Sequence, residues 1–258
     1  MNKVHPSAIV ASGAELAGDV TVGPYSVIED DVRIGAGTVI GPHCVIKSYT
    51  TIGRNNRVAQ FASLGDAPQD KKYAGEPTRL EIGDNNTIRE FVTFNRGTVQ
   101  DAGITRLGND NWIMAYVHLA HDCQIGNNTI FANNTQLAGH VHVHDWAILG
   151  GFTQVHQFCS IGAHAFTAAS SLVLRDVPPY VMAAGNSAEP KAINVEGLRR
   201  RGFSAESIEA IRQAFKTLYK SGLTLNEAVA ALTGQAAQHA ELRILLDFIS
   251  ASRRSLIR

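Results

Sequence analysis

The chain has 258 residues, of which 45% are hydrophobic and only 7% aromatic, a balance that suits a thin core of Ile, Val and Leu. Its 23 basic and 23 acidic residues give a formal net charge of zero, which argues against bulk binding to nucleic acid. No apolar run is long enough to span a bilayer, and none follows the first three residues as in a secretory signal. These features predict a cytoplasmic protein without a transmembrane segment.

A large apolar residue recurs at every sixth position in two stretches of the chain. The first stretch runs from Val4 to Leu64 and the second from Leu107 to Ile161, and neither misses a position. Neither an α-helix nor an alternating strand has this period. Gly or Ala follows many of the large residues, as tight corners between very short strands require. The pattern predicts a parallel β-solenoid of hexapeptide repeats, in which each unit buries its aliphatic side chain by stacking on the next.

This repeat resembles that of the left-handed parallel β-helix acyltransferases, whose triangular coils hold three hexads each. The resemblance implies a mainly β fold in which residues eighteen apart in the sequence lie one above the other. The left hand is implied by the resemblance alone, because parallel crossovers are otherwise right-handed in almost all proteins.

Two polar segments interrupt the repeat. Residues 66–81 contain many turn-forming residues and are interpreted as a loop that projects from the prism. In the competing interpretation they form a regular coil, which would bury Asp70 and Glu76 without partners at a high cost. The second segment, residues 97–106, shifts the register by one residue before Leu107 restarts it. Long loops on a rigid scaffold often carry function.

A helical pattern replaces the repeat from about residue 190 onward. Ser204 is placed to cap one helix, and Thr224 and Glu227 have the spacing of a capping box for the next. Such a cap has a structural reason to exist, because the open end of a solenoid exposes unpaired strand edges. We therefore expect a β-helical domain at residues 1–188 and a C-terminal α-helical domain at residues 189–258.

The three cysteines, Cys44, Cys123 and Cys159, all occupy the small inward-facing position of the hexad. Ser, Thr, Ala and Val fill this position in many other repeats. The pattern favours buried thiols that act as small hydrophobic side chains over a disulfide or metal ligands.

Polar residues suited to acid–base chemistry gather on three consecutive coils. The spacing of eighteen stacks His121, Gly139 and Gln157 on one another, and it stacks Asp122 and His140 in the same way. Acyl transfer to a hydroxyl needs a base, a carboxylate that orients its imidazole, and a donor for the oxyanion. His121, Asp122 and the backbone N–H of Gly139 are the candidates for these tasks. Because adjacent side chains of a strand point apart, contact between His121 and Asp122 requires a bend.

Five motifs carry a closer resemblance, which extends over essentially the whole chain. They are His118-Leu-Ala-His121-Asp122, Leu137-Ala-Gly139-His140, His156-Gln157-Phe158, Gln69-Asp70-Lys71-Lys72-Tyr73 and Asn194-Val-Glu196-Gly-Leu-Arg-Arg200-Arg201-Gly-Phe. They resemble the acyl-[acyl-carrier-protein]:UDP-N-acetylglucosamine O-acyltransferases, the family that opens lipid A biosynthesis. The resemblance implies transfer of an (R)-3-hydroxyacyl chain from acyl carrier protein to the 3-hydroxyl of the glucosamine of UDP-N-acetylglucosamine. It also implies a homotrimer with sites between subunits, without a cofactor or metal.

Carried over position by position, the resemblance implies that His121 is the general base, that Asp122 orients it and that Gly139 gives the oxyanion its N–H. The positions that match binding of the sugar nucleotide or the acyl chain are Asp70, Lys72, His118, His140, His156, Gln157, Asn194, Glu196, Arg200 and Arg201. Ala169 occupies the coil in which the family stops the acyl chain, and its small side chain predicts a preference for chains of roughly twelve to fourteen carbons. The sequence departs from the family at Asn95, where many members have His, so the resemblance assigns no contact to Asn95.

Two other interpretations stay open. The same solenoid forms a zinc carbonic anhydrase in which three histidines bind the metal between subunits, and His140, His142 and His144 alternate so that all three point one way. Inward-facing Val141 and Val143 would equally leave these histidines as a solvated or subunit-facing row. The third interpretation is a non-catalytic repeat scaffold, which explains the hexads but not the clustered polar corner, the two loops or the cap.

Overall fold

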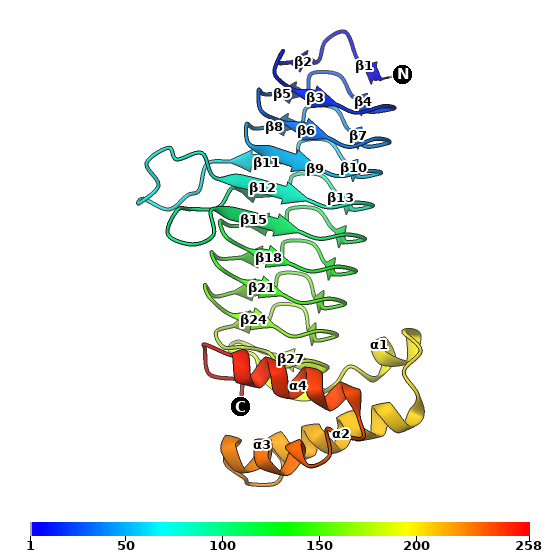
Figure 1. Ribbon diagram of the computed structural model, residues 1–258, viewed down its shortest axis with the longest axis vertical. Coiled ribbons are helices and arrows are strands. Elements are labelled where there is room, and N and C mark those ends of the chain that lie inside the picture. The colour runs from blue at the N-terminus through cyan, green and yellow to red at the C-terminus, as the bar shows by residue number, and fades with distance from the viewer. Residues whose placement is uncertain (1) are drawn as a thin grey trace.

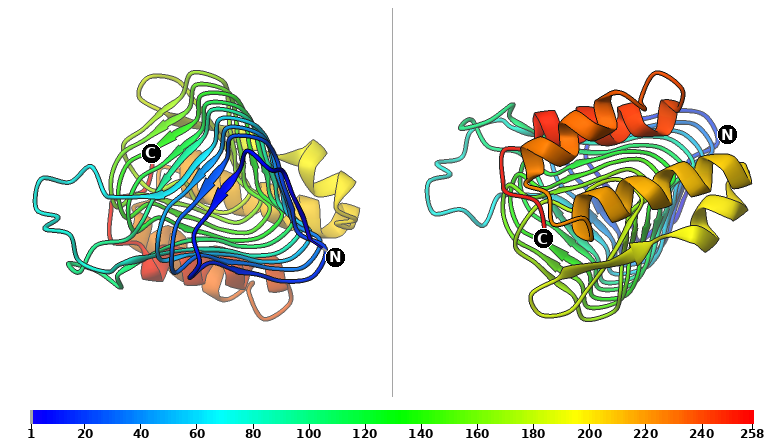
Figure 2. Two further views of the ribbon diagram at one scale, coloured as in Figure 1. Left: turned by 90° about the horizontal axis from the view of Figure 1, so that it is seen from above. Right: turned by 90° about the horizontal axis from the view of Figure 1, so that it is seen from below.

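The computed structural model describes residues 2–258, and its strands stack into a three-sided prism (Figure 1). Each regular coil contributes one short strand to each of three sheets, here called A, B and C. Seen from above, the coils superpose as a stack of triangles (Figure 2). The hexads of the sequence are therefore the sides of this prism.

The three sheets run the length of the prism. Sheet A contains β1 (Lys3–Val4), β4 (Thr21–Val22), β7 (Val39–Ile40), β10 (Arg57–Val58), β13 (Thr87–Ile88), β16 (Trp112–Ile113), β19 (Ile130–Phe131), β22 (Ile148–Leu149), β25 (Phe166–Thr167), β27 (Val181–Ala184) and β28 (Glu189–Ile193). Sheet B contains β2 (Ile9–Val10), β5 (Val27–Ile28), β8 (Val45–Ile46), β11 (Ser63–Asp66), β14 (Thr93–Asn95), β17 (His118–Leu119), β20 (Gln136–Leu137), β23 (Gln154–Val155) and β26 (Leu172–Val173). Sheet C contains β3 (Glu15–Leu16), β6 (Arg33–Ile34), β9 (Thr50–Ile52), β12 (Arg79–Ile82), β15 (Ile104–Leu107), β18 (Gln124–Ile125), β21 (His142–Val143) and β24 (Ser160–Ile161). Their pairing is parallel except between β27 and β28, which are antiparallel.

The register of the sheets places residues eighteen apart next to each other. Leu119 of β17 pairs with Leu137 of β20, which in turn pairs with Val155 of β23. The large residues of the hexads from Val22 to Ile161 are buried in one continuous core. Each buried aliphatic side chain stabilises the fold by roughly 1.5 to 3 kcal/mol relative to an exposed one. The three cysteines lie in this core as free thiols, as predicted.

The corners between strands depend on residues in the left-handed backbone conformation. Positive φ angles recur every sixth residue, and many of these positions hold Asp or Asn, which tolerate this conformation. Between sheets B and C the same position is filled by Asp122 (φ 60°), His140 (φ 60°) and Phe158 (φ 65°) on three successive coils. This corner therefore carries a carboxylate, an imidazole and a phenyl ring one above another.

Both polar segments leave the prism at the same corner, between sheets B and C. The first loop, residues 67–78, connects β11 to β12, and Ile82 pairs with Ile52, a separation of 30 residues where a regular coil has 18. The segment is thus an insertion and not a regular coil. The second loop, residues 96–103, connects β14 to β15 and lies on the coil that precedes His121. Both loops project on one side of the prism (Figure 1).

Four helices of the described residues close the C-terminal end: α1 (Val195–Arg200), α2 (Ala205–Tyr219), α3 (Leu225–Thr233) and α4 (Ala240–Ala251). The predicted N-cap at Ser204 and the capping box of Thr224 and Glu227 are both present, whereas the sequence did not predict α1. After α4 the chain returns to the prism, where Leu256 forms a β-bridge with Asp176. Within residues 2–258, no helix combines the length and apolarity that crossing a membrane requires.

Candidate active site

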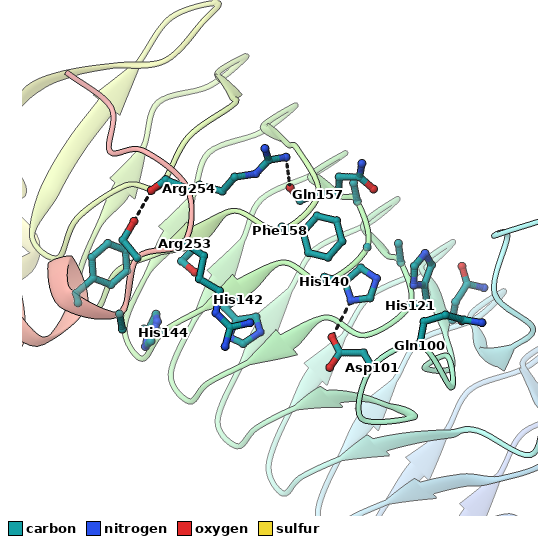
Figure 3. A pocket seen from close by; sticks show the side chains of 18 of the residues that line it. Gln100, Asp101, His121, His140, His142, His144, Gln157, Phe158, Arg253 and Arg254 are labelled. Atoms are coloured by element: carbon teal, nitrogen blue, oxygen red, sulfur yellow. Dashed lines mark hydrogen bonds and ion pairs between the residues drawn. The ribbon is translucent and has the colours of Figure 1, made fainter. Parts of the chain in front are cut away.

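A groove of about 1700 Å³ follows the corner between sheets B and C and continues to the helical cap (Figure 3). The first loop supplies Asp70 and Lys72 at one end, and α4 with the residues after it supplies Phe248, Arg253 and Arg254 at the other. The middle is lined by the predicted residues His118, His121, Gly139, His140 and Gln157. The eighteen-residue stacking thus brings together most of the polar residues that the sequence singled out.

His121 and Asp122 form a hydrogen-bonded pair in this groove. The Nδ1 atom of His121 lies 2.9 Å from Oδ2 of Asp122. The bend at Asp122 brings these adjacent side chains together, as the sequence required. The Asp122 side chain is 1% exposed and that of His121 is 15% exposed, so the carboxylate is buried behind a ring that reaches the groove. With Nδ1 directed at the carboxylate, Nε2 is the nitrogen of the neutral ring that can accept a proton.

The buried carboxylate of Asp122 is supported by the second loop. Thr98 donates its backbone N–H to Oδ1 at 2.9 Å and its hydroxyl to Oδ2 at 2.6 Å. Burial disfavours the charged form, but the hydrogen bonds from His121 and Thr98 outweigh it and hold the pKa of Asp122 below its usual value. Asp122 is therefore ionised at neutral pH, where it can orient the imidazole and stabilise its protonated form.

Gly139 packs directly against the ring of His121. A Cβ atom at Gly139 would lie 2.5 Å from Cε1 and 2.7 Å from Nε2 of His121. The φ angle of Gly139 is not in the left-handed region, so this close approach, rather than backbone conformation, requires glycine. Within residues 2–258, no group accepts a hydrogen bond from the N–H of Gly139. A backbone donor without a partner therefore stands beside the candidate base.

His140 is held by contacts on several sides. Its Nδ1 atom lies 2.7 Å from Oδ2 of Asp101 in the second loop and 3.9 Å from Oδ2 of Asp122. Its ring stacks on Phe158 with a centroid distance of 4.4 Å and meets the ring of His121 edge-on at 5.0 Å. The ring therefore has a defined position next to the His121–Asp122 pair.

The other predicted residues of this edge have simpler surroundings. The Nδ1 atom of His118 lies 2.7 Å from Oγ1 of Thr93, and burial lowers the pKa of His118, which keeps it neutral at pH 7. His156 lies outside the groove lining, and its Nδ1 atom is 3.1 Å from Nη2 of Arg254. Asp70 accepts a hydrogen bond of 3.0 Å from the backbone of Lys72, which shapes the first loop at the mouth of the groove.

Four predicted residues lie on a different edge of the prism. Asn194 caps α1 and donates to the carbonyl of His164 at 3.0 Å, and Arg201 lies over the ring of Trp146 at 5.2 Å. Trp146 and His164 form the corner between sheets C and A. Glu196 and Arg200, on the same short helix, are exposed. Figures 1 and 2 place α1 on the side of the prism opposite the first loop, so this set does not meet His121 within one chain.

Ala169 lies at the third corner, where the chain passes from β25 of sheet A to β26 of sheet B. It does not line the groove. The residue predicted to stop the acyl chain is therefore separated from His121 within one chain, like the residues of α1.

The chain matches known proteins from end to end. Residues 13–48 and 104–139 match the model for bacterial transferase hexapeptide repeats, and residues 176–257 match the model for domain 2 of UDP N-acetylglucosamine O-acyltransferase. The acyl-[acyl-carrier-protein]–UDP-N-acetylglucosamine O-acyltransferase of Thiobacillus denitrificans is 64% identical over 258 residues, with 100% of both chains covered. The chain belongs to the acyl-[acyl-carrier-protein]–UDP-N-acetylglucosamine O-acyltransferase family.

Solved structures of this O-acyltransferase family share the fold. LpxA from Acinetobacter baumannii is 46% identical with a TM-score of 0.96, and 99% of each chain is covered. The UDP-N-acetylglucosamine acyltransferase of Francisella novicida is 43% identical with a TM-score of 0.97, covering 99% of this chain and 94% of the other. The predicted left-handed parallel β-helix with a helical cap is confirmed, and so is the predicted enzyme class, an O-acyltransferase.

The histidine row of the zinc interpretation does not converge on one point within one chain. Within the described residues, the group of possible metal ligands whose atoms lie within 4.8 Å of one another consists of His121, Asp122 and His140. His142 and His144 line the groove outside this group, and burial lowers the pKa of each. The family assignment takes the place of both the carbonic anhydrase and the scaffold interpretations.

Sequence reasoning missed the residues that support the acyltransferase groove from outside the repeat. Thr98 and Asp101 of the second loop contact Asp122 and His140, and Arg254 donates to the carbonyl of Gln157 at 3.2 Å. The eighteen-residue rule cannot place residues of loops and of the C-terminal segment, because they have no position in the hexad.

Asn95, at the position where the sequence departs from the family pattern, is buried in the same region. Its Nδ2 atom donates to the carbonyl of Ala67 at 3.0 Å, and it lines the groove. Asn95 therefore ties the first loop to β14.

Proposed function

We propose that this chain transfers an (R)-3-hydroxyacyl chain from acyl carrier protein to the 3-hydroxyl of the glucosamine of UDP-N-acetylglucosamine, with His121 as the general base. The observation that supports this chemistry best is the pair formed by His121 and the buried Asp122 at 2.9 Å, beside the unpartnered N–H of Gly139. The two proposed substrates, an acylated acyl carrier protein and UDP-N-acetylglucosamine, are those that appear in the names of the relatives. We place the reaction in the cytoplasm, at the start of lipid A biosynthesis, and assign it no metal or cofactor.

In the proposed mechanism, Nε2 of His121 removes the proton from the sugar hydroxyl as the oxygen attacks the thioester carbonyl. Asp122 keeps the other ring proton on Nδ1 and stabilises the imidazolium that forms. The oxyanion of the tetrahedral intermediate accepts a hydrogen bond from the N–H of Gly139. When the intermediate collapses, the C–S bond breaks, the ester C–O bond remains, and His121 gives its proton to the leaving thiolate.

The residues along the groove have the proposed task of holding the substrates. Five predicted binding residues line the same groove as His121: Asp70, Lys72, His118, His140 and Gln157. This supports binding of the sugar nucleotide or the acyl chain along the groove. His156 lies next to Gln157 and is held through Arg254. We propose the same binding role for His156, as the family resemblance implied.

We also propose a homotrimer in which each site lies between two subunits. Five of the predicted site residues lie on other edges of the prism than His121: Asn194, Glu196, Arg200, Arg201 and Ala169. A neighbouring subunit that turns sheet A, which runs between the α1 edge and the Ala169 corner, toward the His121 groove would bring both sets to that groove. A closed ring of three identical interfaces would complete three such sites.

Ala169 is proposed to limit the acyl chain from this neighbouring subunit. We expect Ala169→Met to shift the preferred acyl length to shorter chains, because the added side chain fills space that the end of the chain occupies. Each excluded methylene removes about 0.8 kcal/mol of binding. Competition between carrier-protein substrates of different chain length, with wild type and variant side by side, measures the shift. An unchanged length profile would show that the chain ends elsewhere.

A direct assay tests the proposed function. Purified protein is given UDP-N-acetylglucosamine with a 3-hydroxyacyl carrier protein and, separately, with the matching coenzyme A thioester, and the product is identified by mass and by the position of the ester. We expect a 3-O-acylated sugar nucleotide and a strong preference for the carrier protein. If neither donor gives this ester, the proposal is contradicted.

A further inference from the structure

The second loop places a carboxylate beside a second histidine of the groove. Oδ2 of Asp101 lies 2.7 Å from Nδ1 of His140, and the Asp101 side chain is 48% exposed (Figure 3). The rings of His140 and His121 are 5.0 Å apart and nearly perpendicular, at 88°. Two histidine–carboxylate pairs therefore stand next to each other, and the family motifs in the sequence include only one of the two carboxylates.

We propose that Asp101 is a positioning residue that fixes the ring of His140 for binding the sugar nucleotide. Its carboxylate accepts the Nδ1 proton, which leaves Nε2 as the ring nitrogen open to a ligand in the groove. Stacking on Phe158 restrains the plane of the ring, but it does not prevent a half-turn that exchanges the sides of the ring. The hydrogen bond to Asp101 does prevent that half-turn. This inference rests on the proposed function, because it concerns the same site.

The base of the second loop is built rigidly enough for this task. Thr98 is 1% exposed and is bound to Asp122 through both its N–H and its hydroxyl. The N–H of Asp101 donates to the carbonyl of Thr98 at 3.2 Å, which closes the turn that carries Asp101. A Cβ atom at Gly97 would lie 2.1 Å from the backbone nitrogen of Ile104, so the two ends of the loop are in close contact. One short loop thus supports both histidine–carboxylate pairs.

Steady-state kinetics of Asp101→Ala and Asp101→Asn test this role. We expect Asp101→Ala to raise KM for UDP-N-acetylglucosamine about tenfold, with kcat changed by less than about threefold, because a charge-assisted restraint on a binding group is lost. Asp101→Asn still offers an acceptor oxygen, so its KM for UDP-N-acetylglucosamine should lie between those of Asp101→Ala and wild type. Asp31→Asn is the matched control, because Asp31 is an exposed corner residue between β5 and β6, on the same edge of the prism but far from the groove.

A double-mutant cycle with His140→Ala separates the possible roles of Asp101. If Asp101 acts through His140, its removal adds less than about twofold to KM in the His140→Ala background. A full tenfold effect in that background would overturn the proposal in favour of direct contact between Asp101 and substrate. An unchanged KM together with a lowered Tm would also overturn the proposal, because Asp101 would then only stabilise the second loop.

Nitrogen NMR of the histidines gives a readout that does not depend on turnover. We expect the signal of His140, assigned by its loss in His140→Ala, to show the proton on Nδ1 in wild type and a mixture of tautomers in Asp101→Ala. The same tautomer in both proteins would overturn the proposal. If wild type shows the expected tautomer but transfers no acyl group, the proposed function fails and the positioning of His140 stands.

Discussion

Replacement of His121 by alanine is expected to lower kcat by at least about 10²-fold, because a general base contributes about 10² to 10⁴ to the rate. The loss should be mainly in kcat, since the residues proposed to bind the substrates remain in the groove. Rates of acyl transfer at saturating concentrations of both substrates measure it. A kcat within about threefold of wild type would show that another group accepts the proton.

The stability of this variant separates chemistry from folding. The backbone of His121 is held by its carbonyl, which accepts a 3.0 Å hydrogen bond from the N–H of His140, and this bond does not depend on the imidazole. We therefore expect Tm to stay close to that of wild type. His239→Ala is a suitable control, because His239 precedes α4 without a side-chain hydrogen bond to cap it. Full activity is expected of the control.

Replacement of Gly139 by alanine is expected to lower kcat about 10²-fold, because misplacing a catalytic group by about 1 Å has effects of that size. The new methyl group would occupy space 2.5 Å from Cε1 of His121, so the ring must move away. The backbone N–H of residue 139 remains in the variant. The loss would therefore report the displacement of His121 rather than the removal of the oxyanion donor.

Gly18→Ala provides a matched control for this prediction. Gly18 has the same position in its hexad as Gly139, two residues after the large apolar residue, and nothing lies within 4 Å of an added Cβ. The methyl group would point into open space, so kcat and Tm should both stay near wild type. Equal losses in the two variants would show that the corner backbone, and not the ring of His121, requires glycine.

The period of six made most of the groove predictable. Because the coil converts eighteen residues of sequence into contact between neighbours, the stacking of His121 under Gly139 and of Asp122 under His140 followed from counting. The contact between His121 and Asp122 did not follow from counting, because adjacent side chains of a strand point apart and the sequence could only state that a bend was required. Helix caps at Ser204 and Thr224 have local signals and were equally visible.

The residues outside the repeat that contact the site could not be predicted from a sequence pattern. Thr98 contacts Asp122 from 24 residues away in the sequence, and Arg254 contacts Gln157 from 97 residues away, and neither separation is set by the repeat. Insertions and chain ends break the relation between sequence distance and position, so their contacts arise only from the folded chain.

The period of six also bears on Ala169, to which the family resemblance gave the role of stopping the acyl chain. Ala169 follows His121 by 48 residues, which is two coils and two further hexads, so counting alone places the two residues at different corners. A role for Ala169 next to the chemistry of His121 therefore needs a second subunit. The same holds for the residues of α1.

Complementation between two inactive subunits tests most directly whether the site joins two chains. His121→Ala subunits keep the α1 edge and lack the base, whereas Arg200→Ala subunits keep the base and lack an exposed arginine of that edge. When both are coexpressed in equal amounts, about one quarter of the sites in randomly mixed trimers should combine an intact groove with an intact neighbouring edge.

The measured quantity is the kcat/KM of the mixed preparation against that of each variant alone, because His121 is proposed to act in the chemical step and Arg200 in substrate binding. The proposed arrangement predicts about one quarter of the wild-type kcat/KM, well above the mean of the two variants. A kcat/KM no higher than that mean would contradict the arrangement, because a site contained in one chain gains nothing from its neighbours.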